Sequence, residues 1–82
     1  MNNFNLNLFK YFYYVVYYNG FNNASRNLNI AQSALSYNIK QLEIQLNTKL
    51  IDRSNKNFKL TDDGNNLFES IINMFENLYR NL

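Results

Sequence analysis

The apolar residues of the first thirty positions recur with the spacing of two helices. In the first pattern they lie three or four positions apart, and Asn19-Gly20 follows as a pair that tolerates the left-handed backbone of helix ends. A shorter helix is predicted over residues 21–28, and Asn29 and Ile30 allow a tight turn after it. Because the chain has no proline and only two glycines, we expect long helices and short connections. The apolar residues of the first pattern are Leu8, Phe9, Phe12, Val15 and Val16.

A third helical pattern, from Gln32 to an ending at Asn47, carries the most information. Its leucines and isoleucine recur at spacings of four, three and four, which predicts one continuous buried stripe. The opposite face carries short hydrogen-bonding side chains and one cation, and it can enter a DNA major groove without desolvating a carboxylate. The simpler interpretation is a solvated face on which Lys40 pairs with Glu43, but the position after a short helix and a tight turn favours recognition. The stripe consists of Leu35, Ile39, Leu42 and Leu46, and the polar face of Gln32, Ser33, Ser36, Tyr37 and Lys40.

Two short apolar runs, at residues 50–51 and 58–60, flank the polar turn of residues 54–57 and predict a β-hairpin. A small hairpin rich in cations beside a groove-sized helix is typical of a wing that reaches phosphates or the minor groove. The alternative is a solvated loop whose charges are incidental. The cations that we assign to DNA-backbone contact are Lys40, Lys49, Arg53, Lys56 and Lys59.

A fourth helix is predicted from Thr61, whose hydroxyl can cap it, while the carboxylates of Asp62 and Asp63 suit the positive end of the helix dipole. The apolar stripe that follows is too wide to be buried within so small a chain, so we expect it to pair with a second copy. The predicted dimer contacts are Phe68, Ile71, Ile72, Phe75, Leu78 and Tyr79, and the stripe also includes Leu67 and Leu82.

Five tyrosines occupy the remaining positions of the first helix and form what we call the tyrosine belt. We expect these rings to pack in the core or in a dimer. Stacking on single-stranded bases is the alternative, but such surfaces interleave rings with Lys or Arg, and only Lys10 lies nearby. The belt consists of Tyr11, Tyr13, Tyr14, Tyr17 and Tyr18.

Composition and charge narrow the classes of function. The 82 residues, 46% of them hydrophobic, suffice for one small core, and residues 1–60 carry seven Lys or Arg against two acids, which suits a polyanionic partner. The absence of Cys and His excludes disulfides and thiolate or imidazole metal sites and removes the commonest general base. Since the six carboxylates are scattered, we expect neither an enzyme nor a cofactor.

No stretch predicts a membrane partner or a secretion signal. The ring-rich stretch of residues 11–18 is too short to span a bilayer, and Met1-Asn2-Asn3 lacks the basic start of a signal peptide. We therefore expect a cytoplasmic, nucleoid-associated protein.

Three successive motifs resemble the amino-terminal domain of LysR-type transcriptional regulators. Residues 24–36, ASRNLNIAQSALS, continue through Ile39, Leu42 and Glu43 in the register of that family's helix-turn-helix. Residues 49–53, KLIDR, are similar to the start of its wing, and residues 60–64, LTDDG, to the opening of its linker helix. The resemblance implies a linker helix that dimerises. It also implies that Gln32, Ser33, Ser36 and Tyr37 contact base edges, and that Arg53 contacts the backbone and the minor groove.

The chain departs from the family pattern at three points. Ala31 stands where a capping Ser is usual, which removes a cap worth about 1 kcal/mol. Tyr37 replaces a frequent Arg, so a bidentate guanine reader is lost and a different operator is expected. The sequence stops at Leu82, before the ligand-sensing domain, so we expect no small-molecule effector site within it.

These patterns together predict a mainly α fold. It would comprise a winged helix-turn-helix over residues 1–60, with three helices and a two-stranded wing, and a linker and dimerisation helix over residues 61–82. The leading functional hypothesis is sequence-specific binding of double-stranded DNA as a homodimer that regulates transcription. The alternative is a winged-helix module that binds protein and not DNA.

Overall fold

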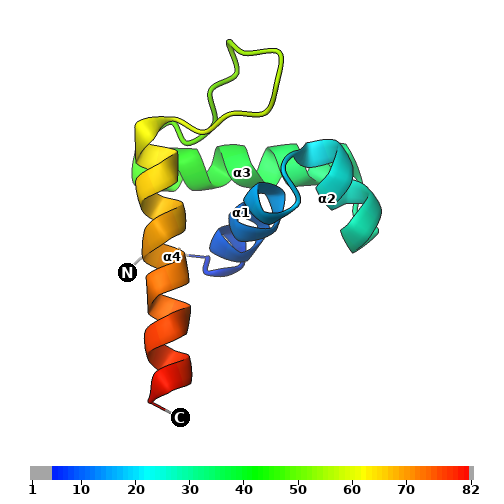
Figure 1. The fold of residues 1–82 in the computed structure, drawn as a ribbon. Coiled ribbons are helices and arrows are strands. Elements are labelled where there is room, and N and C mark those ends of the chain that lie inside the picture. Colours follow the sequence, from blue (N-terminus) through cyan, green and yellow to red (C-terminus); the bar gives the residue numbers. More distant parts are fainter. Residues whose placement is uncertain (1–4, 82) are drawn as a thin grey trace. The chain divides into compact units, whose positions relative to one another are not determined.

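The structure, a computed structural model, describes residues 5–81, which form four helices in the order that the periodicity predicts (Figure 1). The expectations for Met1–Asn3 and for Leu82 lie outside the described residues. Within this part of the chain, no helix has both the length and the apolarity needed to cross a membrane. The helices are α1 (Asn7–Tyr17), α2 (Phe21–Leu28), α3 (Gln32–Leu46) and α4 (Asp62–Arg80).

The chain divides after Thr48 into two compact units, and the first contains α1, α2 and α3. These three helices contact one another in every pair, and α1 crosses α3 (Figure 1). Their shared core is buried and includes side chains from each helix. Of the predicted α3 stripe, Leu35, Ile39 and Leu42 are completely buried in it, whereas Leu46 is half-buried. The core residues of this unit are Leu8, Phe12, Val15, Ala24, Leu35, Ile39 and Leu42.

Each helix of the first unit is followed within two residues by an asparagine with a left-handed backbone. Asn19, Asn29 and Asn47 have φ of 61°, 57° and 52°. After each of them, the next backbone N–H donates to a carbonyl five residues earlier, for example Gly20 to Val15 at 2.9 Å. This arrangement satisfies carbonyls that the helix leaves unpaired, and asparagine tolerates its conformation better than most side chains. The predicted helix ends at Asn19 and Asn47 are therefore confirmed.

The tyrosine belt of α1 packs largely on itself. Tyr13 stacks on Tyr17 with ring centroids 5.9 Å apart, and Tyr14 stacks on Tyr18 at 6.3 Å. Of the five rings only Tyr17 is exposed, and the others are half-buried. The Lys10 ammonium lies over the Tyr11 ring, 5.4 Å from its centroid. Rings four positions apart on a helix cover one another, which contributes to the partial burial of the belt.

Candidate nucleic-acid interface

The turn between α2 and α3 is closed by a single serine. The Ser25 hydroxyl donates to the Ile30 carbonyl oxygen at 2.6 Å, and the Ile30 N–H donates to the Ser25 carbonyl oxygen at 3.2 Å. Asn29 supplies the left-handed residue between them. These two hydrogen bonds and the left-handed backbone of Asn29 fix the residue at which α3 begins and the direction of α3 relative to α2. Sequence reasoning did not single out Ser25 as a closing residue.

The beginning of α3 lacks a side-chain cap, as the presence of Ala31 predicts. Ala31 precedes the helix without a side-chain hydrogen bond to it. Its carbonyl oxygen still accepts from the N–H groups of Ala34 and Leu35, at 3.0 and 3.1 Å. The helix therefore starts through backbone bonds and through the Ser25 turn, with no contribution from a capping hydroxyl.

The structure places the predicted polar face of α3 opposite its buried stripe. Gln32, Ser33 and Lys40 are exposed, and Tyr37 is 62% exposed. Ser36 is half-buried at the edge of this face. The first two turns of α3 therefore carry amide, hydroxyl and phenol groups and no acid. The Lys40 ammonium follows in the next turn of the helix. Such a set can donate and accept hydrogen bonds at base edges in a major groove.

Glu43 follows Lys40 by three positions on α3, about 60° around the helix, but its side chain is far less exposed. Its side chain is 5% exposed, whereas Lys40 is exposed. Of these two charged side chains, only that of Lys40 is exposed. Beyond Lys40 the exposed residues of α3 include Ile44 and Gln45.

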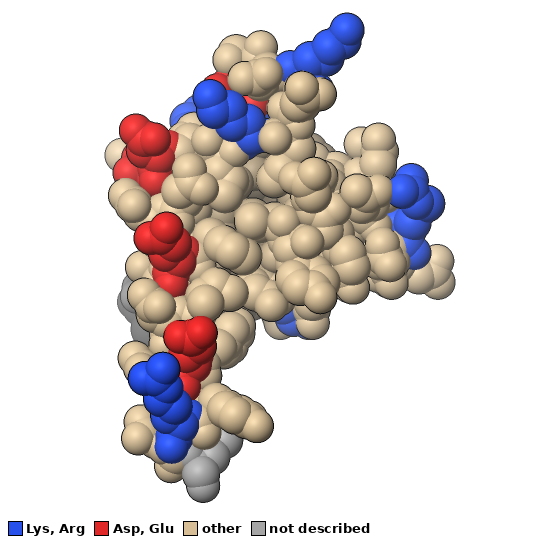
Figure 2. Space-filling model, viewed as in Figure 1, with Lys and Arg blue, Asp and Glu red and all other residues tan. Residues whose placement is uncertain are grey.

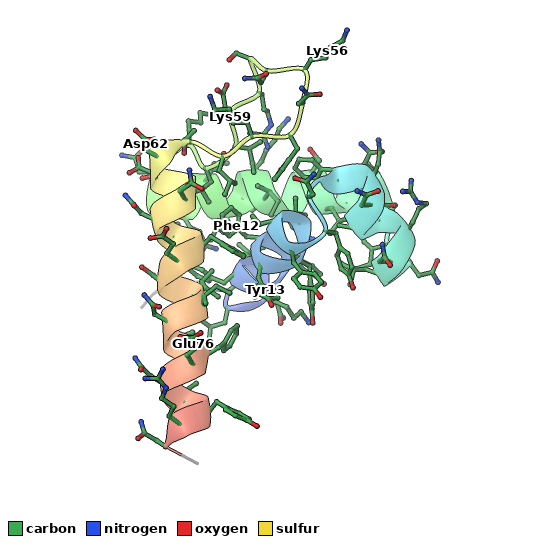
Figure 3. The ribbon with its side chains drawn as sticks, in the orientation of Figure 1. Phe12, Tyr13, Lys56, Lys59, Asp62 and Glu76 are labelled. Atoms are coloured by element: carbon green, nitrogen blue, oxygen red, sulfur yellow. The ribbon has the colours of Figure 1, made fainter. Side chains whose placement is uncertain are left out.

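The second compact unit contains the wing, which is the loop between α3 and α4 and spans residues 49–61. Ile51 and Leu60 form one antiparallel bridge, and the Asp52 N–H donates to the Lys59 carbonyl oxygen at 2.9 Å. The predicted hairpin pairing is thus present but limited to this bridge, without longer strands among the described residues. The four wing cations are exposed, and Lys56 lies at the tip of the loop (Figure 3). They are Lys49, Arg53, Lys56 and Lys59.

An acidic residue within the wing is held by its neighbour. The Asp52 carboxylate accepts from the Ser54 hydroxyl at 2.6 Å and from the Ser54 N–H at 3.0 Å. These bonds, the side-chain bond first, hold the pKa of the Asp52 carboxyl below its ordinary value, and the nearby Lys59 ammonium acts in the same direction. Asp52 is therefore ionised at neutral pH, with an oxygen turned toward the turn of the wing.

Thr61 and Gly64 join the wing to α4. The Thr61 hydroxyl accepts from the Gly64 N–H at 3.0 Å, as the predicted cap requires, and it also donates to the Lys49 carbonyl oxygen at 2.6 Å. The Thr61 N–H donates to the Leu50 carbonyl oxygen at 3.0 Å. Gly64 is buried directly against that carbonyl, where an added Cβ would overlap the Leu50 oxygen. The first turn of α4 is thereby fixed to the base of the wing.

The predicted dimer contacts on α4 differ in exposure. Ile71 is buried and Phe68 and Ile72 are half-buried, whereas Phe75 and Leu78 are 50% and 57% exposed. Tyr79 is 81% exposed, and Met74, which the sequence analysis did not include, is 51% exposed. The second half of α4 therefore presents large apolar side chains to solvent. Acidic side chains lie along α4, which ends with the basic Arg80, and other basic side chains lie in the wing that precedes the helix (Figure 2).

The candidate residues form two groups, one in each compact unit. The polar face of α3 belongs to the first unit, and the wing cations belong to the second. Among residues 5–81 no cluster of three or more Asp, Glu, His or Cys side chains could hold a metal ion. What the arrangement offers chemically is hydrogen bonding and positive charge at exposed positions.

Comparison with known proteins identifies a family over most of the chain. The family described as "Bacterial regulatory helix-turn-helix protein, lysR family" matches residues 6–65. A probable RuBisCO transcriptional regulator of Cyanidioschyzon merolae is 39% identical over 66 residues, which cover 80% of this chain and 22% of that protein. The HTH-type regulator YcaN of Escherichia coli is 32% identical over 74 residues, which cover 90% of this chain and 24% of that protein. The chain thus spans less than a quarter of the length of these relatives.

Solved structures agree with this assignment. The BenM DNA-binding domain in a complex with benA site 1 DNA is 31% identical and superposes with a TM-score of 0.82, covering 94% of this chain and 90% of that one. The LysR-family regulator CbnR, 24% identical with a TM-score of 0.78, supports the fold. The mainly α, winged helix-turn-helix class is therefore confirmed, and the region is a DNA-binding domain of a transcription regulator, not an enzyme. The chain belongs to the lysR family of bacterial regulatory helix-turn-helix proteins.

Proposed function

We propose that this chain binds double-stranded DNA of a particular sequence as a homodimer and thereby regulates transcription. The observation that carries the proposal is the exposed, hydrogen-bonding face of α3, in a helix whose Leu35, Ile39 and Leu42 are completely buried. The BenM DNA-binding domain, which was crystallised with DNA, supports it through 31% identity over nearly the same length. We assign residues 1–60 to the winged helix-turn-helix and residues 61–82 to the linker helix.

In this proposal the two groups of residues have different tasks. The polar face reads base edges in the major groove, with the Gln32 amide suited to adenine and the Tyr37 ring and hydroxyl in place of a guanidinium. The cations attract phosphates and fix the register of the protein on the duplex without reading sequence. The base-contact set is Gln32, Ser33, Ser36 and Tyr37, and the phosphate-contact set is Lys40, Lys49, Arg53, Lys56 and Lys59.

The dimer follows from the exposed second half of α4. Phe75, Leu78 and Tyr79 are each at least half exposed in the single chain. The same apolar stripe on a second copy would bury these side chains. Two chains paired in this way hold two copies of α3 against successive major grooves of a partly palindromic site.

Selection of bound duplexes from a random pool, followed by titration of the winning duplex and a scrambled one at two salt concentrations, tests the proposal. We expect enrichment of one motif and affinity that falls steeply with salt, because bound cations displace counterions from DNA. The alternative, a winged-helix module that binds protein, predicts no salt-dependent binding to any duplex even at low salt.

Gln32→Ala is expected to remove about 1–3 kcal/mol of discrimination at one base pair of the selected site. The amide is the only side chain of the first turn that can bind adenine through two hydrogen bonds, so the loss should be confined to that pair. Affinities for the full set of single-base variants of the site measure it. Equal weakening on all variants would show that Gln32 orients the helix and does not read a base.

Arg53→Ala is expected to weaken binding to every duplex by a similar factor and to reduce the slope of log affinity against log salt by about one. The exposed guanidinium lies in the wing, where it contributes charge and not base discrimination. Anisotropy titrations over a series of salt concentrations check this result. An unchanged slope would exclude Arg53 from the interface with phosphate.

A further inference from the structure

One carboxylate lies among the cations of the wing. Asp52 directly precedes Arg53, and Lys59 is close enough to lower its pKa. A negative charge at a surface proposed to meet phosphate opposes binding, because like charges repel across the few ångströms of such a contact. We therefore expect Asp52 to have a structural role that offsets this repulsion.

The hydrogen bonds of Asp52 supply that role. Its backbone N–H donates to the Lys59 carbonyl oxygen on the opposite arm of the wing, at 2.9 Å. Its side-chain oxygen accepts both the Ser54 hydroxyl, at 2.6 Å, and the Ser54 N–H, at 3.0 Å. Asp52 thus connects the paired base of the wing with its turn, and both side-chain bonds close around Arg53, the residue between Asp52 and Ser54.

The short pairing of the wing makes these bonds important. The two arms share one antiparallel bridge, at Ile51 and Leu60, and the residues beyond it form turns and bends. A loop with so little regular pairing has many conformations available to it, and ordering it on binding lowers affinity. Bonds to a charged acceptor are among the stronger hydrogen bonds, so they limit the conformations at this point of the loop.

We propose that Ser54 is a positioning residue for DNA binding, which holds Asp52 so that the wing presents the Arg53 side chain to the duplex already ordered. The inference rests on the proposed function and deepens it. It assigns a role in the interface to a serine that carries no charge and that needs no contact with DNA. It also explains how an aspartate is tolerated in a basic wing, since its oxygen is directed to the turn of the protein.

A double-mutant cycle between Ser54 and Arg53 tests the inference. Ser54→Ala is expected to weaken binding to the selected duplex about three- to tenfold, because it removes the bond from the hydroxyl to a charged acceptor. In the Arg53→Ala background the same substitution should cost less than about twofold, since the side chain that it positions is gone. Ser54→Thr, which keeps the hydroxyl, should retain most of the affinity, and Asn55→Ala is the matched control in the same exposed turn.

The outcomes separate the inference from the proposed function. Equal losses in both backgrounds, or no loss in Ser54→Ala, would overturn the positioning role while DNA binding by the unmodified chain stands. Failure of the unmodified chain to bind any duplex at low salt would overturn the proposed function itself. Thermal unfolding of Ser54→Ala followed by circular dichroism, with NMR contacts between Ile51 and Leu60, verifies that the wing remains folded in the variant.

Discussion

Gly64→Ala is expected to destabilise the second compact unit by about 3 kcal/mol, although alanine is the better helix former by about 1 kcal/mol. The reason is the close approach of α4 to the wing. An added Cβ at this position would overlap the Leu50 carbonyl oxygen and lie 3.2 Å from the Leu60 Cβ. The overlapped atom belongs to the backbone, so it cannot turn away as the end of a flexible side chain could. Either the helix or the base of the wing must move.

Such movement would break the bonds that join the two elements. The Thr61 N–H donates to the same Leu50 oxygen, and the Thr61 hydroxyl donates to the neighbouring Lys49 carbonyl. We therefore expect the melting temperature to fall by about 10–20 °C for a domain of this size. Thermal unfolding followed by circular dichroism measures the change.

Asn66→Ala serves as the matched control for Gly64→Ala. Asn66 is exposed on the same helix, two positions further along, so helix propensity alone decides its effect there. We expect the control to be neutral or slightly more stable than the unmodified chain. If Gly64→Ala also proved neutral or stabilising, the close contact with Leu50 would not exist in solution.

Phe75→Asp is expected to weaken the proposed dimer by about a hundredfold or more. Phe75 is half exposed in the single chain and lies in the middle of the exposed apolar stretch of α4. A two-fold pairing buries the substituted position twice, and a carboxylate buried without a partner costs about 3–5 kcal/mol. Light scattering and sedimentation over a series of protein concentrations measure the shift from dimer to monomer.

The same substitution should also reduce affinity for a palindromic duplex by about 10²-fold or more, because two linked half-site contacts become independent. Asn73→Asp is the control. It adds the same charge one half-turn away, where acidic residues already occupy the helix, and it should leave the dimer intact. A dimer of unchanged affinity in Phe75→Asp would place the interface between copies elsewhere on the chain.

Periodicity was sufficient to locate α3 and most of its buried stripe, although Leu46 is half-buried and Glu43 is buried. Leu35, Ile39 and Leu42 are completely buried, and Gln32, Ser33 and Tyr37 are exposed, because the repeat of an α-helix alone decides which residues share a side. Two of the asparagine helix ends were predictable for a similar local reason. Asparagine is among the few residues with a side chain that adopt a left-handed backbone at low cost.

The same periodicity could not divide the apolar stripe of α4. It places Ile71 and Phe75 together, yet Ile71 is buried and Phe75 is half exposed. A helical repeat indicates which side of a helix is apolar. It does not indicate which turns of that side are covered by other parts of the protein. The predicted dimer contacts therefore remain a prediction, with their test in Phe75→Asp.

The features that could be predicted from the sequence alone are local ones. These are the helices and their ends, the polar side of α3, the Thr61 cap and the positions of the wing cations, each of which depends on neighbours within one or two turns. The tertiary structure decided the contacts between distant segments. Gly64 is required because the Leu50 carbonyl, fourteen positions earlier, approaches it, and the wing is paired only at Ile51 and Leu60. Contacts across such separations depend on how the chain folds back on itself, and no local pattern of side chains specifies that distance.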